Sequence, residues 1–249
     1  MKQDKRKIIQ NAFIGVWLIA LITIWIGKTH TSHQFCPYAS VCFGAMLPNG
    51  YTTYLISIII GLAIAISTIF LGRKFCGSIC FFGTIQERIF HFKKSNNTII
   101  IPTTLDFFLK SLKYIIFFGT IYFAYTLAAF KYMNFCPVIA LSFPMQITIF
   151  GATSLLIIFV GSFIIERFWC RYLCPYAAFM NMFIYLGKIL RIKRKVIRVN
   201  SAKCISCKLC DIACPMSIKI VNNSQVNDPN CIYCGNCIDK CPKHGIFYK

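Results

Sequence analysis

Residues 204–215 read CISCKLCDIACP, and residues 231–242 repeat the pattern as CIYCGNCIDKCP. Both stretches have the spacing C-x2-C-x2-C-x3-C-P, which is typical of bacterial proteins that hold two iron–sulfur clusters. The first three thiolates of such a run can hold three corners of one 4Fe–4S cubane, and the fourth cysteine ligates the other cluster. The spacing therefore predicts that residues 203–249 form a small ferredoxin-like α+β domain with two 4Fe–4S clusters.

Each predicted cluster takes ligands from both stretches. We expect the first cluster to be held by Cys204, Cys207, Cys210 and Cys241, and the second by Cys231, Cys234, Cys237 and Cys214. A zinc site would use C-x2-C pairs at longer spacing, and disulfides are rare in a cytoplasmic segment. Because so short a domain cannot bury a sufficient core, the clusters should also stabilise its fold.

The chain as a whole has the composition of a membrane protein. Of the 249 residues, 57% are hydrophobic and 14% are charged, which excludes an ordinary soluble or disordered protein. Four apolar stretches have the length of bilayer spans, at about residues 8–26, 52–71, 112–130 and 146–165. We therefore predict a mainly α membrane domain over residues 1–187, followed by a basic juxtamembrane linker over residues 188–202.

The distribution of positive charge predicts the orientation of these spans. The chain has 27 Lys and Arg against 7 Asp and Glu, which gives a net charge of +20. Basic side chains precede the first span and lie between the second and third, whereas the other two connecting segments contain only Lys28 and Lys131. By the positive-inside rule, we expect a multi-pass protein of the bacterial inner membrane with both termini in the cytoplasm.

The basic segments allow two other interpretations, and the sequence favours neither. A cleaved signal peptide would need a small-residue cleavage site, which the segment Gly27-Lys28-Thr29-His30 does not offer, so we expect the first span to remain as an anchor. The basic run after residue 188 could bind nucleic acid, but no nucleic-acid-binding motif accompanies it. We expect it to contact anionic lipid headgroups, with no nucleic-acid partner.

The membrane part contains an internal repeat. Phe35-Cys36-Pro37 and Phe135-Cys136-Pro137 match, and each precedes a span that ends in Arg-x2-Cys-x3-Cys. We therefore expect the four spans to form two repeated hairpins. The cysteines four apart would share a helix face if each span continued through them, and two packed hairpins would bring four thiolates together as a third iron–sulfur or metal centre. These four are Cys76, Cys80, Cys170 and Cys174; the alternative is that they only pack as small buried apolar residues.

The repeated Phe-Cys-Pro segments suggest a second, less specific metal site on the outer side. Its ligands would be Cys36, Cys42 and Cys136, with His30 and His33 nearby, although an oxidising compartment also allows a disulfide between Cys36 and Cys136. None of the four predicted spans contains a histidine. Paired intramembrane histidines for a b-type haem are therefore missing, and we do not expect a transmembrane haem pair.

The two inner cysteine motifs and the tail together resemble a known family. The motifs read Arg73-Lys74-Phe75-Cys76-Gly77-Ser78-Ile79-Cys80 and Arg167-Phe168-Trp169-Cys170-Arg171-Tyr172-Leu173-Cys174-Pro175. The chain is similar to the membrane-bound ferredoxin-type proteins and polyferredoxins that include NapH of nitrate reductase systems and the C-terminal half of NosR. Phe81 stands where the first motif of that family has proline, which affects the local backbone more than metal binding.

The resemblance implies a protein that carries electrons across or along the membrane, commonly between quinols and periplasmic reductases. We expect its partners to be the membrane, a quinone as cofactor or substrate, and redox proteins such as a periplasmic reductase or a flavin or iron–sulfur subunit. No catalytic residue is identified, and the closest enzyme class is a quinol dehydrogenase-like subunit. Two other functions stay open: a copper-type metal-ion reductase or handling protein that uses the membrane cysteines, and a non-catalytic redox-sensing or anchoring subunit.

The spacing of the ligands leaves the path of the electrons undetermined. Cluster potentials depend on charge, hydrogen bonds and exposure over hundreds of millivolts, so the direction of flow, the donor and the terminal acceptor stay open. A hydrocarbon core of about 30 Å is wide for a single tunnelling step. A quinone, an outer cofactor or a partner subunit is therefore needed to move electrons outward.

Overall fold

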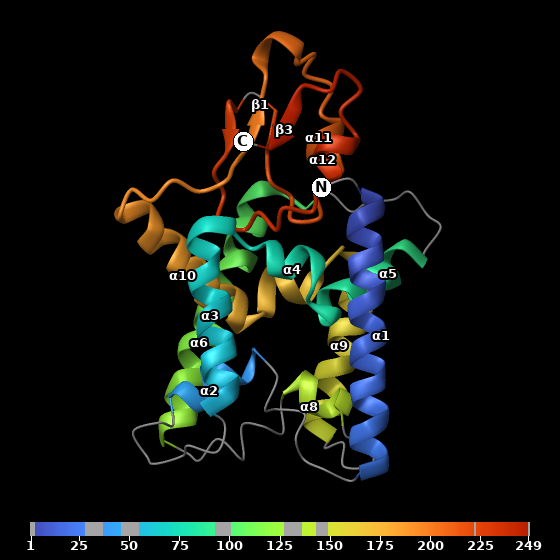
Figure 1. The fold of residues 1–249 in the computed structure, drawn as a ribbon, viewed down its shortest axis with the longest axis vertical. Helices are drawn as coiled ribbons and strands as arrows, with labels where there is room; N and C mark the ends of the chain where they lie inside the picture. The colour runs from blue at the N-terminus through green and yellow to red at the C-terminus, as the bar shows by residue number, and fades with distance from the viewer. Residues whose placement is uncertain are drawn as a thin grey trace. The chain divides into compact units, whose positions relative to one another are not determined.

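The computed structural model describes residues 3–27, 37–45, 55–92, 101–126, 136–142, 149–221 and 223–248. These residues are mainly helical, and the strands among them follow residue 196 (Figure 1). The chain divides into two compact units, which we describe separately. The first consists of Met1–Ile14, Ile66–Thr84 and Met180–Lys249, and the second of Gly15–Ala65 and Ile85–Phe179.

Helices occupy all four regions that the sequence predicts to be spans. α1 (Gln3–Gly27) and α6 (Thr103–Thr126) are long and apolar enough to cross a membrane by length and composition. α3 (Leu55–Leu71) and α9 (Ile149–Ile164) are apolar but shorter, with 17 and 16 residues. The four-span arrangement in two hairpins therefore stays a prediction. α6 begins at residue 103 rather than near residue 112, because the helix includes a polar first part ahead of its apolar run.

The helix before the first inner motif does not continue through its cysteines. α3 ends at Leu71 because Gly72 adopts a left-handed backbone with φ of 62°, which an α-helix cannot contain. The chain then forms α4 (Lys74–Ser78) and the amphipathic α5 (Phe81–Phe92). Cys76 therefore lies on a separate short helix and Cys80 lies in the turn that follows it, so the two do not share one continuous helix face.

The second inner motif is built in a similar way. α9 ends at Ile164, and the motif forms a π-helical turn, η4 (Trp169–Leu173), ahead of α10 (Pro175–Ile189). In both motifs the backbone N–H of the second cysteine donates to the carbonyl five residues earlier. The distances are 3.0 Å from Cys80 N to Phe75 O and 2.9 Å from Cys174 N to Trp169 O. The repeat in sequence is thus also a repeat in local backbone, a wide turn of a kind often found at functional sites.

The C-terminal part is a small antiparallel sheet with short helices. The strands β1 (Ile197–Val199), β2 (Gln225–Val226) and β3 (Ile246–Tyr248) have the order β2-β1-β3, and Ile197 lies opposite Val226 and Tyr248. β1 falls in the segment that the sequence assigns to the linker, so the sheet begins upstream of residue 203. The elements of this part are β1 (Ile197–Val199), η5 (Ser201–Lys203), α11 (Leu209–Ile212), β2 (Gln225–Val226), α12 (Asn236–Asp239) and β3 (Ile246–Tyr248). Two short helices complete the second unit, α2 (Ala39–Gly44) and α8 (Pro137–Ser142).

Candidate iron–sulfur site

The two cysteine stretches of the tail fold into loops with the same backbone. Each loop turns through the left-handed region at the same three motif positions, which lets the chain wrap around an enclosed space. These residues are Ser206 and Tyr233 (both φ 54°), Lys208 and Gly235 (φ 58° and 86°), and Ser217 and His244 (φ 46° and 48°). The second and third cysteines of each run then lie at or beside a short helix, α11 or α12.

The fourth cysteine of each run accepts an equivalent hydrogen bond from the backbone. Ile218 N donates to Cys214 Sγ at 3.4 Å, and Gly245 N donates to Cys241 Sγ at the same distance. Amide donors to sulfur stabilise thiolates and are among the contacts that adjust cluster potentials. Both sulfurs are therefore held in an environment that suits a bound thiolate.

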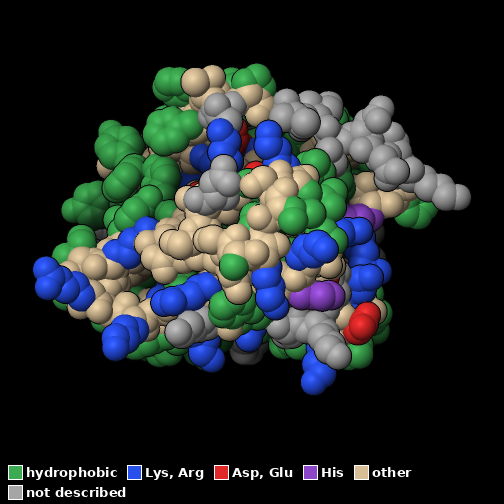
Figure 2. Space-filling view, turned by 90° about the horizontal axis from the view of Figure 1, so that it is seen from above, with side chains coloured by type: hydrophobic (Ala, Val, Ile, Leu, Met, Phe, Trp, Pro, Cys, Tyr) green, Lys and Arg blue, Asp and Glu red, His purple; other side chains and the backbone are tan. Residues whose placement is uncertain are grey.

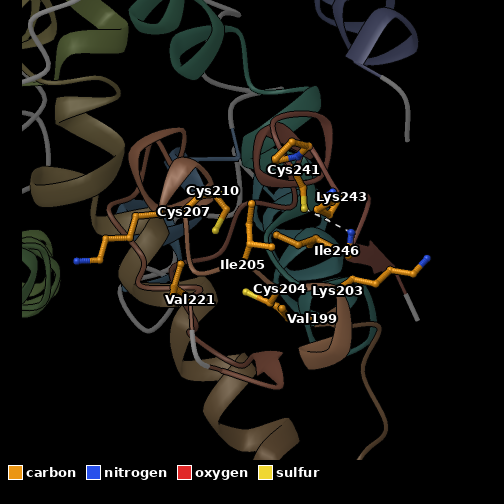
Figure 3. A pocket seen from close by; sticks show the side chains of 13 residues that line it. Val199, Lys203, Cys204, Ile205, Cys207, Cys210, Val221, Cys241, Lys243 and Ile246 are labelled. Atoms are coloured by element: carbon orange, nitrogen blue, oxygen red, sulfur yellow. Dashed lines mark hydrogen bonds between the residues drawn. The ribbon is translucent and has the colours of Figure 1, made fainter.

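The first predicted ligand set gathers around one pocket. Its four cysteines line this pocket together with the lysines at positions 203, 208 and 243 (Figure 3). They are Cys204, Cys207, Cys210 and Cys241, three from the first stretch and one from the second. Four thiols around one cavity fit the corners of a cubane.

The second predicted ligand set also gathers, in a more deeply buried place. The four thiols, Cys214, Cys231, Cys234 and Cys237, lie close enough to influence one another's ionisation. Burial first, and then the neighbouring thiolates, raise the pKa of Cys214 to about 12 and that of Cys237 still further. Thiols such as Cys214 and Cys237, which resist ionisation alone, fit a site where bound iron replaces the protons, since metals bind the thiolate form.

The two sets differ in their access to solvent. Cys207 is exposed, whereas Cys231, Cys234 and Cys237 are buried. The first set therefore has an open side, and three of the four cysteines in the second set are covered by the rest of the first unit.

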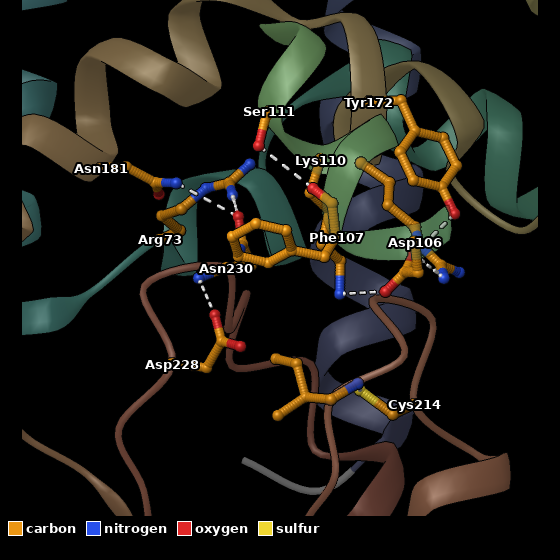
Figure 4. A network of polar contacts seen from close by, with 12 residues as sticks. Arg73, Asp106, Phe107, Lys110, Ser111, Tyr172, Asn181, Cys214, Asp228 and Asn230 are labelled. Atoms are coloured by element: carbon orange, nitrogen blue, oxygen red, sulfur yellow. Dashed lines mark hydrogen bonds and ion pairs between the residues drawn. The ribbon is translucent and has the colours of Figure 1, made fainter. Parts of the chain in front are cut away.

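The first inner motif is part of this cover. The α4 backbone packs so closely on the second stretch that a Cβ added at Gly77 would overlap the carbonyl oxygen of Ile232. Arg73 is fully buried and donates from Nη1 to Asn230 Oδ1 at 3.5 Å, and Asn181 Nδ2 donates to the same oxygen at 3.1 Å (Figure 4). The residue that precedes Cys231 is thereby fixed to the α3–α4 turn and to α10.

The start of α1 completes the cover. Arg6 is 1% exposed; its Nε donates to Gly77 O at 2.8 Å and its Nη1 donates to Asn236 Oδ1 at 3.1 Å. Gln10 Nε2 donates to the same Gly77 carbonyl at 3.2 Å. Asn236 directly precedes Cys237, so a buried guanidinium links the first inner motif to a loop that carries ligands of the second set.

In the second unit, the cysteines of the second inner motif also receive N–H donors. Gln86 Nε2 donates to Cys170 Sγ at 3.5 Å, and Gln86 Oε1 accepts from Trp169 N at 2.8 Å. Ala177 N, in the first turn of α10, donates to Cys174 Sγ at 3.3 Å. Both cysteines are buried, and both sulfurs are placed as acceptors.

A buried ionic network holds this motif to α6. The Asp106 carboxylate accepts from Arg171, from Lys110 at 2.7 Å and from the Tyr172 hydroxyl at 2.8 Å (Figure 4). Polar groups are costly to bury unless they are paired, so this network defines where η4 rests on α6.

Two further sites were predicted from the sequence, a third centre at the inner motifs and a metal site on the outer side. Cys76 and Cys80 belong to the first unit and Cys170 and Cys174 to the second, and their convergence on a third centre stays a prediction. Within the residues described above, no three His, Cys, Asp or Glu side chains are close enough to hold a single metal ion. For the outer site, Cys36 lies outside the described residues, while Cys42 and Cys136 are partly exposed.

Sequence reasoning missed several residues that shape these sites. Arg6 was counted only as a topology signal, and Gln86, Asp106 and Asn236 were not singled out. Gln86 and Asp106 do carry a signal, because each is a polar residue close to an apolar segment and to an inner motif. Arg6 carries none, since its partners Gly77 and Asn236 are distant in sequence.

Comparison with known proteins agrees with the cysteine pattern. A family model described as a 4Fe-4S binding domain matches residues 53–97 and 147–195, the regions of the two inner motifs. A second model, described as a 4Fe-4S dicluster domain, matches residues 196–242. Both models concern iron–sulfur binding, and the first occurs twice in accordance with the internal repeat.

Several curated proteins are similar over much of the chain. YccM of Escherichia coli K12, named for electron transport, is 30% identical over 190 residues, which cover 72% of this chain and 52% of that protein. An uncharacterized protein of Methanocaldococcus jannaschii is 28% identical, covering 74% of this chain and 75% of its own length. The ferredoxin-type protein NapH of Haemophilus influenzae is 36% identical over 103 residues, covering 37% of this chain and 34% of NapH. The chain thus spans about half the length of YccM. No solved structure matches.

Proposed function

Because the chain belongs to the NapH-type polyferredoxin family of iron–sulfur electron-transport proteins, we propose that it is a membrane-bound carrier of single electrons with two 4Fe–4S clusters in its tail. The observation that carries the proposal is the grouping of eight tail cysteines into the two sets described above. Cys204, Cys207, Cys210 and Cys241 would hold one cluster, and Cys231, Cys234, Cys237 and Cys214 the other. When bound, each cluster supplies one-electron redox chemistry at a potential set by its surroundings.

The different exposure of the two ligand sets supports a role for them in series. The set at Cys207 is open to solvent, and the set at Cys234 lies beneath the backbone of the first inner motif at Gly77. The chain's own residues thus provide an open side for exchange with a partner, and a buried side against α1 and α4. Arg6 and Arg73 add two buried positive charges on the buried side, which favour the negatively charged state that a reduced cluster would bring.

For the membrane part, we infer four spans in two hairpins over residues 1–187, with both termini in the cytoplasm of a bacterial cell. The distribution of Lys and Arg supports this orientation, and two of the helices have the length and composition of a span. A quinone, or a partner subunit on the outer side, would then complete electron transfer across the membrane. Cys76, Cys80, Cys170 and Cys174 are the candidate ligands of a third centre between these ends.

One observation favours copper-type metal handling as a second candidate function. Cys76 Sγ lies 4.0 Å from Met180 Sδ, in a fully buried place. A thiolate and a thioether are the soft ligands that select Cu(I). The test is copper binding by the purified protein: loss of a bound Cu(I) in both Cys76→Ser and Met180→Leu would support metal handling, and unchanged binding in either would count against it.

The proposed function is tested by counting iron and acid-labile sulfide per chain in anaerobically purified protein, with EPR after stepwise reduction. We expect at least two cubanes, both reducible by dithionite. Cys207→Ser and Cys237→Ser should each remove the signal of a different cluster, and Cys42→Ser, outside both sets, serves as the matched control. A chain without reducible clusters would contradict the proposal, and iron beyond two cubanes would indicate the third centre.

A further inference from the structure

The loop that carries the first ligand set exposes apolar side chains around an exposed cysteine. Ile205, Leu209 and Ile212 are 59%, 46% and 61% exposed, and Cys207 lies among them in sequence and is itself exposed. Scattered apolar side chains on a surface need no explanation. Here, however, three of them lie within eight residues of chain, on the loop that forms the open side of a redox site.

The internal repeat of the tail shows what covers such a loop elsewhere. Ile232 holds the same motif position as Ile205 but is 1% exposed, because it lies against Gly77. Asn236 holds the position of Leu209, and it accepts a hydrogen bond from Arg6. The two loops share the same left-handed backbone positions but differ in their cover. The loop of the second stretch is covered by α1 and α4, whereas the loop of the first stretch is open.

The rim of the open loop is positively charged. Lys203, Lys208 and Lys243 are exposed and line the pocket of the first ligand set (Figure 3). Asp211, the acidic residue of this loop, turns inward, where its carboxylate accepts from Ile220 N at 2.6 Å and Val221 N at 3.1 Å. Figure 2 shows one face of the molecule on which Lys and Arg side chains far outnumber acidic ones.

We propose that this open face, formed by Lys203, Ile205, Cys207, Lys208, Ile212 and Lys243, docks a small acidic protein that carries single electrons. The inference rests on the proposed electron-carrier function and names its partner at the open ligand set. Complementary charge steers such a partner to the site and fixes its orientation, while a small apolar centre excludes water at the contact. Weak, transient redox encounters bury little surface, so a face formed by one loop and its rim is enough for such a partner.

Anionic lipid is the other surface that a basic rim attracts. The three lysines and Ile205 line the ligand pocket itself. Contact with lipid there would close the access that exchange requires, so the arrangement favours a protein. The two partners predict different results in one experiment, which therefore includes both.

The experiment measures binding of a soluble acidic ferredoxin to the full-length, cluster-loaded protein in detergent, at low and high ionic strength. The test variant carries Lys203→Glu, Lys208→Glu and Lys243→Glu. The matched control carries Lys193→Glu, Arg198→Glu and Lys219→Glu, which change the net charge equally at exposed positions that do not line the pocket. We expect the test variant to bind at least about tenfold more weakly at low salt, and the control to lose less than about threefold.

A third variant probes the apolar centre without changing the charge. Ile205→Ser combined with Ile212→Ser should weaken binding severalfold at high salt and leave its salt dependence unaltered. Equal losses in the test and control variants would show that only bulk charge matters and would overturn the proposal. So would unchanged ferredoxin binding by the test variant, or a loss confined to binding of phosphatidylglycerol vesicles.

Failure of this inference is distinguishable from failure of the proposed function. Cluster content and dithionite reduction are measured on every variant before binding. Normal, reducible clusters without specific binding would reject the docking face alone, whereas absent or irreducible clusters would reject the electron-carrier function.

Discussion

Arg6 illustrates how one side chain can connect distant parts of the chain. Its guanidinium is buried and donates to Gly77 O and to Asn236 Oδ1. A buried cation is stable only where something offsets its charge. A cluster with four thiolate ligands carries negative charge, so we expect Arg6 and a cluster in the second ligand set to stabilise each other.

This leads to a prediction for the potential of the second cluster. Arg6→Met removes a buried positive charge, so we expect the midpoint potential of that cluster to fall by something on the order of tens of millivolts, while the first cluster changes less. Arg6→Lys keeps the positive charge, so the midpoint potential of the second cluster should stay close to that of the unchanged protein. EPR-monitored redox titration measures both, with the exposed Arg198→Met as control; equal shifts in Arg6→Met and Arg198→Met would contradict a local effect.

Asp106 allows a test of stability at the same scale. Asp106→Asn leaves the buried Arg171 and the partly exposed Lys110 beside a neutral amide, which should destabilise the protein by about 3 kcal/mol. Combining it with Arg171→Met removes the stranded cation, and we expect a substantial part of the loss to be recovered. Thermal unfolding in detergent compares the single and double variants, and a double variant that is less stable than either single variant would contradict the pairing.

At the scale of elements, the close packing of α4 on the second cysteine stretch depends on a glycine. Gly77→Ala would force its methyl group into the Ile232 carbonyl, so the α4 turn and the stretch must separate. We expect a destabilisation of about 1–3 kcal/mol, typical of overpacking, with a change in the EPR signal of the second cluster. Gly119→Ala is the control, since nothing lies within 4 Å of its added Cβ. An unchanged signal in Gly77→Ala would show that this contact is dispensable.

The sequence predicted those elements whose signal is local. Cysteine spacing predicted the two groups of thiols, and runs of apolar residues predicted the regions of α1, α3, α6 and α9. The ends of the helices before the inner motifs were harder to predict, because in sequence Gly72 looks like any small residue near a helix end. The cover of the second stretch could not be predicted, since it depends on contacts such as Arg6 to Asn236 that join opposite ends of the chain.

At the scale of the whole molecule, the prediction concerns topology. Alkaline phosphatase fused after Lys249 should be inactive, and the same reporter fused after residue 130 should be active, because the first position is predicted to be cytoplasmic and the second to face outward. A green fluorescent reporter at the same two positions should give the opposite pattern. Activity of the phosphatase at the C-terminus would reverse the proposed orientation.

The left-handed backbone shared by Lys208 and Gly235 has a consequence for the balance between folding stability and electron transfer in this protein. Glycine adopts a φ near 60° freely, whereas a lysine is strained there by roughly 1–2 kcal/mol. Lys208→Gly should therefore raise the free energy of unfolding of the tail by up to about 1 kcal/mol, in spite of glycine's greater freedom in the unfolded chain. If Lys208 serves the docking of a partner, the same change should slow electron transfer to or from that partner. The strained backbone at Lys208 would then lower the stability of the fold in exchange for faster electron transfer.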